Sequence, residues 1–187
     1  MLIFDSAADE ERYNRLFKYN LAEGYLTKNH NNRPMIILDL SKEFGIPEDK
    51  SEFRTVILDN IISQTDTSPY IVSVYKEPIT KRCNFEKDEE AFNMLVKNID
   101  ELMYVIQNYY INCNEIILCC MGKYNEYNYI YNGLITQLRY ANSSVNIKML
   151  NIRHISTYIK NNTKKVNLKS VTILEDILKI NRALDEN

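Results

Sequence analysis

The sequence predicts an α/β protein in which a mostly parallel sheet of about four strands is covered by helices. A stretch across 92–110 carries apolar residues at steps of three and four, the spacing of a long helix with one apolar face. A strand-length apolar run follows at 115–120. This succession of helix and strand recurs along the chain, which is typical of parallel strands joined by helical crossovers.

The first half of the chain is predicted to provide two strands and two helices. A capped segment with acidic residues in its first turn predicts a helix across 7–23. The run across 34–40 is apolar without alternation, as expected of a parallel strand buried on both faces. Residues 51–63 follow as a helix capped by a serine. Aromatic and β-branched residues across 70–75 predict the second strand.

The helix across 92–110 is the most strongly patterned element. Its apolar stripe consists of Phe92, Leu95, Val96, Ile99, Leu102, Met103, Ile106, Tyr109 and Tyr110. Its other side carries Lys97, Asp100, Glu101 and Gln107, which are expected to face water. Together with the strand that follows, this helix forms half of a parallel crossover unit.

The second half of the chain repeats the pattern. A helix is predicted across 125–141, and the alternation across 145–150 predicts a fourth strand at an edge or half-exposed position. A short helix around 155–159 comes next. Ser170 can cap a last helix, whose inward residues are expected to be Val171, Leu174, Ile177, Leu178 and Leu184.

A single domain across 1–187 is the expectation for 187 residues, a length that can bury a full core. The N-terminal helix and loop occupy 1–31, the α/β core 32–160, and a C-terminal loop and helix 161–187. No repeat, low-complexity tract or linker divides the chain.

Charge and hydropathy exclude several partners. The net charge of −2 gives no global attraction to nucleic acid or to an anionic membrane. The lysines across 160–169 leave at most a peripheral membrane contact, and a solvated loop explains them better than a basic patch does. No apolar run approaches the roughly 20 residues of a spanning helix, and the short apolar start of the sequence is not expected to be a signal peptide. The expected location is therefore the cytoplasm, and the oligomeric state stays open.

Cysteine and glycine usage predicts neither a metal nor a cofactor. Adjacent Cys119 and Cys120 fall in an apolar strand, where free buried thiols are expected, and the chain has no CxxC pair. The phosphate-binding patterns GxGxxG and GxxxxGK[ST] are both absent, and only 4 glycines occur in the chain.

Polar side chains at the predicted strand ends are the candidates for chemistry, because ligands of open parallel sheets bind there. Asp39 could act as a base or metal ligand, although capping a loop or pairing with Lys42 is the commoner role. His154 is more typical of a surface or capping histidine than of a catalytic base, since no carboxylate lies near it in sequence. An enzymatic alternative is a metal-dependent hydrolase or nucleotide-processing enzyme with Asp39, Glu43 and Glu77 as ligands.

The order of segments resembles that of a known family. Residues 32–37 read NRPMII and resemble the Gly-Arg-Pro-apolar strand opening of Sec14-like (CRAL-TRIO) domains, with asparagine in place of the glycine. Residues 95–120 resemble the family's long helix, turn and buried strand, and 145–159 its final strand and short helix. The similarity, strongest to a divergent branch in scaffold proteins such as Rho GTPase-activating proteins, covers roughly 32–160.

Two features depart from the family pattern. The His-Pro pair that usually follows the third strand is replaced by Met121-Gly122-Lys123, and the N-terminal helical lobe is reduced to one helix.

The resemblance implies a non-enzymatic binding module for a lipid or a protein partner, such as a small GTPase. It implies that 127–138 is the helix gating a lipid cavity, with Tyr127, Ile130, Tyr131, Leu134 and Leu138 along it. The implied cavity floor consists of Ile37, Ile71, Ile117 and Cys119. It implies no catalytic residue, no metal and no cofactor. These residues could equally be solid core.

A third interpretation comes from composition alone. Asparagine, isoleucine, lysine and tyrosine are abundant, as in products of AT-rich genomes, which leaves open a pocketless interaction protein of a virus or mobile element.

Overall fold

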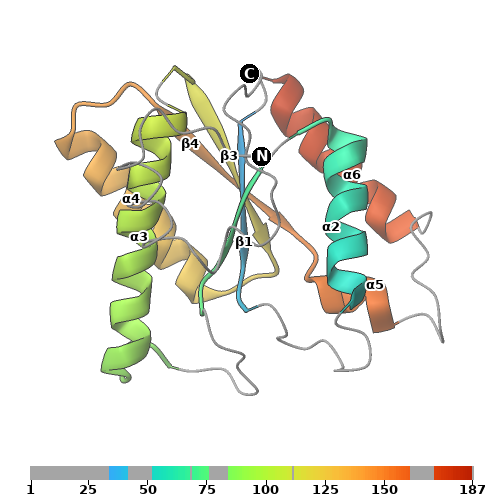
Figure 1. The fold of residues 1–187 in the computed structure, drawn as a ribbon, viewed down its shortest axis with the longest axis horizontal. Helices are drawn as coiled ribbons and strands as arrows, with labels where there is room; N and C mark the ends of the chain where they lie inside the picture. The colour runs from blue at the N-terminus through green and yellow to red at the C-terminus, as the bar shows by residue number, and fades with distance from the viewer. Residues whose placement is uncertain are drawn as a thin grey trace, which may run out of the picture.

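The computed structural model describes residues 34–41, 52–67, 69–75, 84–110, 112–160 and 171–186. These residues form alternating strands and helices (Figure 1). In chain order the elements are β1 (Met35–Asp39), α2 (Glu52–Thr65), β2 (Tyr70–Ser73), α3 (Glu89–Tyr109), β3 (Glu115–Met121), α4 (Asn125–Tyr140), β4 (Asn146–Ile152), α5 (Ile155–Lys160) and α6 (Val171–Asp185). The predicted α/β class is confirmed, and each predicted element in the described part of the chain is present.

The strands form one parallel sheet in the order β2-β1-β3-β4. The chain first moves outward from β1 to β2, and then crosses back over β1 to β3 and on to β4. The direction of winding therefore reverses between β1 and β3, and this position is the topological switch point of the sheet.

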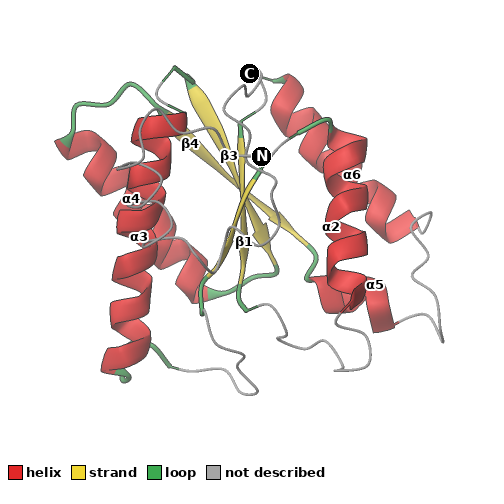
Figure 2. Ribbon diagram, viewed as in Figure 1, coloured by secondary structure: helices red, strands yellow, loops and turns green. Residues whose placement is uncertain are grey.

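Helices cover both faces of the sheet, in three layers (Figure 2). The helices α3 and α4 pack against each other on one face, while α2, α5 and α6 cover the other. Alternate residues of the central strand β3 enter the two cores, as the two-residue period of a strand requires. Leu118 faces α3 and α4, whereas Ile117 and Cys119 face α2 and α6.

Element boundaries differ only slightly from those predicted. The strand β2 ends at Ser73, although Val74 and Tyr75 still donate backbone hydrogen bonds of 2.9 Å to the carbonyls of Asp39 and Leu40. The alternating strand β4 does lie at an edge, and its middle is half-buried.

The side of α3 that was expected to face water is partly buried. Glu101 is 5% exposed, and the Tyr70 hydroxyl donates a 2.6 Å hydrogen bond to its carboxylate. Conversely Phe92 and Val96 are exposed at the start of the helix, where the Phe92 ring contacts Tyr129 edge-on. The predicted division of α3 into an apolar face and a water-facing side was therefore wrong at these three positions, because α3 packs on both the sheet and α4.

The inward face predicted for α6 was also partly wrong. Ile177 and Leu184 are buried, but Val171, Leu174 and Leu178 are exposed. The buried face is rotated along the helix and consists of Ile173, Asp176, Ile177, Ile180, Ala183 and Leu184.

Cys119 and Cys120 are free and buried, as predicted, and Cys113 is free and half-buried. Within the described ranges, no helix combines the length and apolarity that crossing a membrane requires. The predicted helix across 7–23, the lysines between 161 and 169, and Cys83, Glu43 and Glu77 lie outside the described residues.

Candidate functional site

The carboxyl edge of the sheet at the switch point is the candidate site. After β1 and β3 the chain leaves toward opposite faces, since α2 and α4 lie on different sides of the sheet. In open parallel sheets this divergence leaves a crevice at the strand ends, where ligands bind. Polar residues at the ends of β1, β3 and β4 meet here.

Six side chains at this position form what we call the edge cluster: Asp39, Ser41, Tyr124, Glu126, Tyr127 and His154. Asp39, Ser41 and Glu126 are each 1% exposed, and His154 is 9% exposed. Ionisable groups buried this deeply must be compensated by neighbouring groups, and they are more common at functional sites than elsewhere.

Asp39 and His154 form the centre of the edge cluster. Asp39 is the last residue of β1, His154 directly precedes α5, and Asp39 Oδ1 lies 3.9 Å from His154 Nε2. The backbone N–H of Ser156 donates to His154 Nδ1 at 3.2 Å, and the Ser156 hydroxyl lies 2.9 Å from the same nitrogen. Because Nδ1 accepts, the proton of the neutral imidazole is assigned to Nε2, facing Asp39. His154 thus caps α5 and directs an N–H toward a carboxylate.

The first turn of α4 supplies a second carboxylate and a buried phenol. The Tyr75 hydroxyl donates to Glu126 Oε1 at 3.3 Å, and the Tyr127 hydroxyl donates to the carbonyl of Met121 at 3.0 Å. Burial raises the pKa of Tyr127 well above its usual value, and the nearby Asp39 carboxylate raises it further. The phenol therefore remains a neutral hydrogen-bond donor at physiological pH.

Gly122 allows Tyr124 to lie over the edge cluster. Gly122 has φ +101°, and a Cβ at this position would lie 2.6 Å from Tyr124 Cε2. Any other residue would be strained in the backbone and would displace the ring. The half-buried Tyr124 ring meets the His154 ring edge-on with centroids 6.1 Å apart.

The chemistry of the edge cluster favours hydrogen-bond donors and cations. Two buried carboxylates, Asp39 and Glu126, belong to the edge cluster, so a phosphate would meet repulsion. The Ser41 hydroxyl is buried and has no hydrogen-bond partner among the described residues. Within the part of the chain that the structure describes, no three His, Cys, Asp or Glu side chains are placed to hold a metal ion.

The residues implied to enclose a lipid lie on opposite faces of the sheet. The floor residues Ile37, Ile71, Ile117 and Cys119 belong to the core under α2 and α6. The helix residues Tyr127, Ile130, Leu134 and Leu138 belong to the core under α3 and α4, with Tyr131 packed at its margin. All except Tyr131 are at most 5% exposed. The two groups therefore do not line a common cavity.

Sequence reasoning identified Asp39 and His154 separately but not their proximity. They are far apart in sequence, and their proximity depends on the strand order, which places only β3 between β1 and β4. Glu126 was not singled out, because an acidic residue in the first turn of a helix is usually a solvated partner of the helix dipole.

The fold and this site define a parallel α/β protein with a polar switch-point site. Comparisons with protein-family models, with curated proteins and with solved structures gave no significant match.

Proposed function

We propose that this chain is a non-enzymatic, Sec14-like binding module that recognises a protein partner at the edge cluster. The observation that carries the proposal is the burial of Asp39, Glu126 and His154 together at the switch point. Of the two ligand types that the resemblance implies, the protein partner is preferred to the lipid.

The packing of the two cores supports this preference. A lipid carried between helix and sheet needs an apolar space bounded by both. Here Leu134 packs on one face and Ile117 on the other, each with 0% exposure. Such residues gain their stabilising free energy from close packing with protein atoms, at about 25 cal/mol per Å² of buried apolar area.

The electrostatics of the edge cluster indicate the type of side chain that the partner presents. Asp39 and Glu126 create a negative potential in a poorly hydrated edge. The half-buried Tyr124 ring can accept a cation against its face. A lysine or arginine of a partner protein satisfies both requirements.

Neutralising the two carboxylates tests the proposal. The double variant Asp39→Asn/Glu126→Gln keeps side-chain volume and is expected to lower partner binding at least about tenfold, because a buried charge partner is lost. The measurement is quantitative cross-linking mass spectrometry of the tagged full chain in its source cell. The matched control is Glu89→Gln/Glu90→Gln, which neutralises two exposed carboxylates at the start of α3. Equal cross-linking by all three proteins, or a stoichiometric lipid in native mass spectrometry, would refute the proposal.

A metal-dependent hydrolase is the second candidate function, favoured by the position of Asp39 at the carboxyl end of β1 beside His154. It predicts that MgCl₂ or MnCl₂ raises the Tm of the full chain, since a bound ion stabilises only the folded state. Asp39→Ala should abolish that rise, whereas Asp100→Ala on the exposed side of α3 should preserve it. An unchanged Tm in the wild-type protein counts against the hydrolase.

A further inference from the structure

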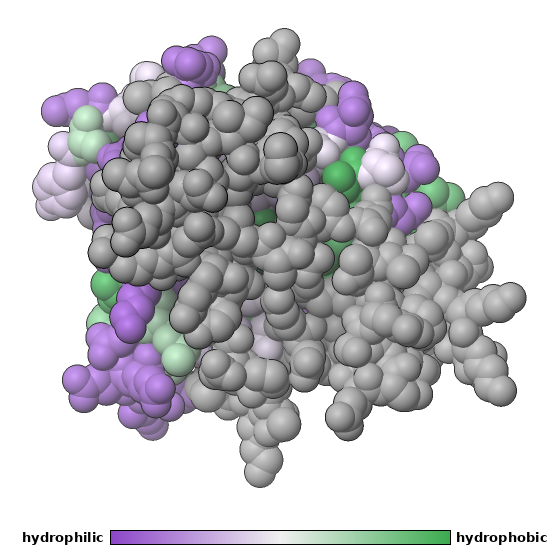
Figure 3. Space-filling model, in the orientation of Figure 1, coloured by the Kyte–Doolittle hydropathy of each residue, from purple (hydrophilic) through white to green (hydrophobic). Residues whose placement is uncertain are grey.

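The helix α6 carries a second apolar stripe that faces away from the core. Val171, Leu174 and Leu178 are 71%, 42% and 56% exposed, and their spacing of three and four places them on one side of the helix. In Figure 3, apolar atoms lie among polar ones at the upper right, where α6 lies in Figure 1. Three branched aliphatic side chains aligned in water are unusual for a helix that already buries its other face.

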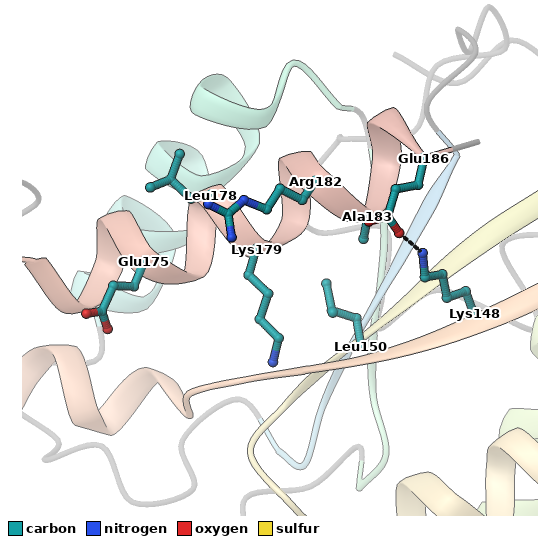
Figure 4. A pocket seen from close by; sticks show the side chains of 8 residues that line it. All are labelled: Lys148, Leu150, Glu175, Leu178, Lys179, Arg182, Ala183 and Glu186. Carbon is teal, nitrogen blue, oxygen red and sulfur yellow. Dashed lines mark hydrogen bonds and ion pairs between the residues drawn. The ribbon is translucent and has the colours of Figure 1, made fainter.

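A groove lies beside this stripe, between α6 and the edge strand β4. Its volume is about 380 Å³, and it is lined by Lys148, Leu150, Glu175, Leu178, Lys179, Arg182, Ala183 and Glu186 (Figure 4). Lys148 closes one end through a 2.6 Å ion pair with Glu186. Lys179 donates to the carbonyl of Asn151 and is thereby held toward β4.

Arg182 continues the apolar stripe by one helical turn beyond Leu178. Its side chain runs back along α6 toward Leu178 (Figure 4). No residue in the described ranges forms a hydrogen bond or ion pair with its guanidinium. Glu175 lies one turn before Lys179, and its carboxylate pairs with Arg153 at 2.7 Å. Its side chain is nevertheless 55% exposed. The stripe is therefore bounded by a cation on one side of Leu178 and an anion on the other.

We propose that the surface formed by Val171, Leu174, Glu175, Leu178 and Arg182, which we call the α6 stripe, binds the α6 stripe of a second copy of this chain in antiparallel orientation. Glu175 and Arg182 are placed symmetrically about the peptide between Leu178 and Lys179. A twofold axis at that point sets each Arg182 level with Glu175 of the second copy. The same axis packs the two Leu178 side chains together and covers Leu174 with the alkyl part of Arg182.

Charge complementarity is the reason for choosing a second copy as the occupant. An isologous interface must be complementary to itself, and the α6 stripe carries both members of the required ion pair. Lys179 would lie at the axis, but its bond to the Asn151 carbonyl draws it away from the second Lys179. A helix of 15 residues is about 22 Å long, so the contact is small and the dimer should be weak.

A charge swap across the axis tests the dimer by sedimentation equilibrium of the full chain. Arg182→Glu and Glu175→Arg are each expected to raise the dimer Kd roughly tenfold, because each places like charges opposite one another. The double variant Arg182→Glu/Glu175→Arg restores opposite charges and should return the Kd to within about threefold of wild type. Leu178→Asp should raise the Kd by roughly 30-fold or more, because it places a carboxylate at the centre of the contact.

Tyr140→Asp is the matched control, since Tyr140 is 84% exposed on α4, on the other face of the sheet. It should leave the Kd unchanged. Far-ultraviolet circular dichroism checks that each variant is folded, which the exposure of the substituted side chains favours. A wild-type protein that stays monomeric at all concentrations, or a dimer insensitive to Leu178→Asp, overturns the proposal. So does a double variant that fails to regain the wild-type Kd while remaining folded.

Discussion

Raising the pH above about 9 is expected to lower the free energy of unfolding steeply, because the fold buries several neutral acids. Burial raises the pKa of Cys119 from its ordinary value of 9.0 to about 12, and it raises the pKa of Cys120 well above the same ordinary value. Burial likewise raises the pKa values of Tyr110, Tyr127 and Tyr158 above 10.0. All five groups stay protonated in the folded state at a pH where the unfolded chain ionises.

The sign and size of the effect follow from proton linkage. Above the pKa of an exposed thiol, the unfolded chain binds fewer protons than the folded protein, so alkali favours unfolding. Each such group lowers the free energy of unfolding by about 1.4 kcal/mol per pH unit until its folded-state pKa is reached. The two thiols act first and the phenols join about one unit higher, so several kcal/mol are lost before about pH 11.

Urea unfolding at a series of pH values measures this loss. The free energy of unfolding should be constant from about pH 7 to pH 8.5 and should then fall with increasing slope. Cys120→Ala removes one titrating group, so its slope above about pH 9 should be shallower by about 1.4 kcal/mol per unit. Cys113→Ala is the comparison variant. Burial raises the pKa of the Cys113 thiol as well, but this thiol is only half-buried, so its removal should change the slope less than Cys120→Ala does. A wild-type protein with equal stability at pH 7 and pH 10 would show that the thiols and phenols are accessible.

The fold class could be predicted because several short-range signals agree. The apolar run of β3, the periodicity of α3 and the Gly-poor helices each indicate one local structure, and crossover helices between strands leave a parallel sheet as the solution. The strand order was not predicted. Whether β3 pairs with β1 or β2 is decided by packing between faces that look equally apolar in sequence.

The faces of α3 and α6 show where periodicity reaches its limit. A stripe drawn through Val171, Leu174 and Leu178 fits a helical period as well as one drawn through Ile173, Ile177 and Ile180. The structure buries the second stripe and exposes the first. The helix α6 therefore carries more apolar residues than its buried face uses, and the proposed self-association is inferred from these additional residues.

The edge cluster shows a different limit. Asp39 and His154 were visible as polar residues at strand ends, but their separation of 3.9 Å depends on the order of four strands. Glu101 and Glu126 are buried for a similar reason, since each accepts a hydrogen bond from a tyrosine that is far away in the sequence. Contacts between residues far apart in sequence leave no periodic trace, so a single sequence cannot reveal them.

Truncating Ile117 and Leu134 to alanine is expected to destabilise the protein by about 2–5 kcal/mol each, because both side chains are fully buried. The two side chains lie in different cores, separated by the sheet. Their effects on the free energy of unfolding should therefore add to within about 0.5 kcal/mol in the double variant. Urea unfolding of the wild type, both single variants and the double variant gives the coupling energy.

This set of four proteins forms a double-mutant cycle, which also distinguishes closely packed cores from a lipid cavity. If Ile117 and Leu134 bounded one apolar cavity, truncation would enlarge an existing space and would cost less at each site than truncation in a closely packed core. The two substitutions would also be coupled, because they would share one cavity. Leu118 and Leu134 provide the comparison, since both belong to the core between the sheet and the helices α3 and α4, and a departure from additivity is expected for this pair. Large, additive costs for Ile117 and Leu134 would show that both cores are closely packed and would count against a lipid cavity shared by them.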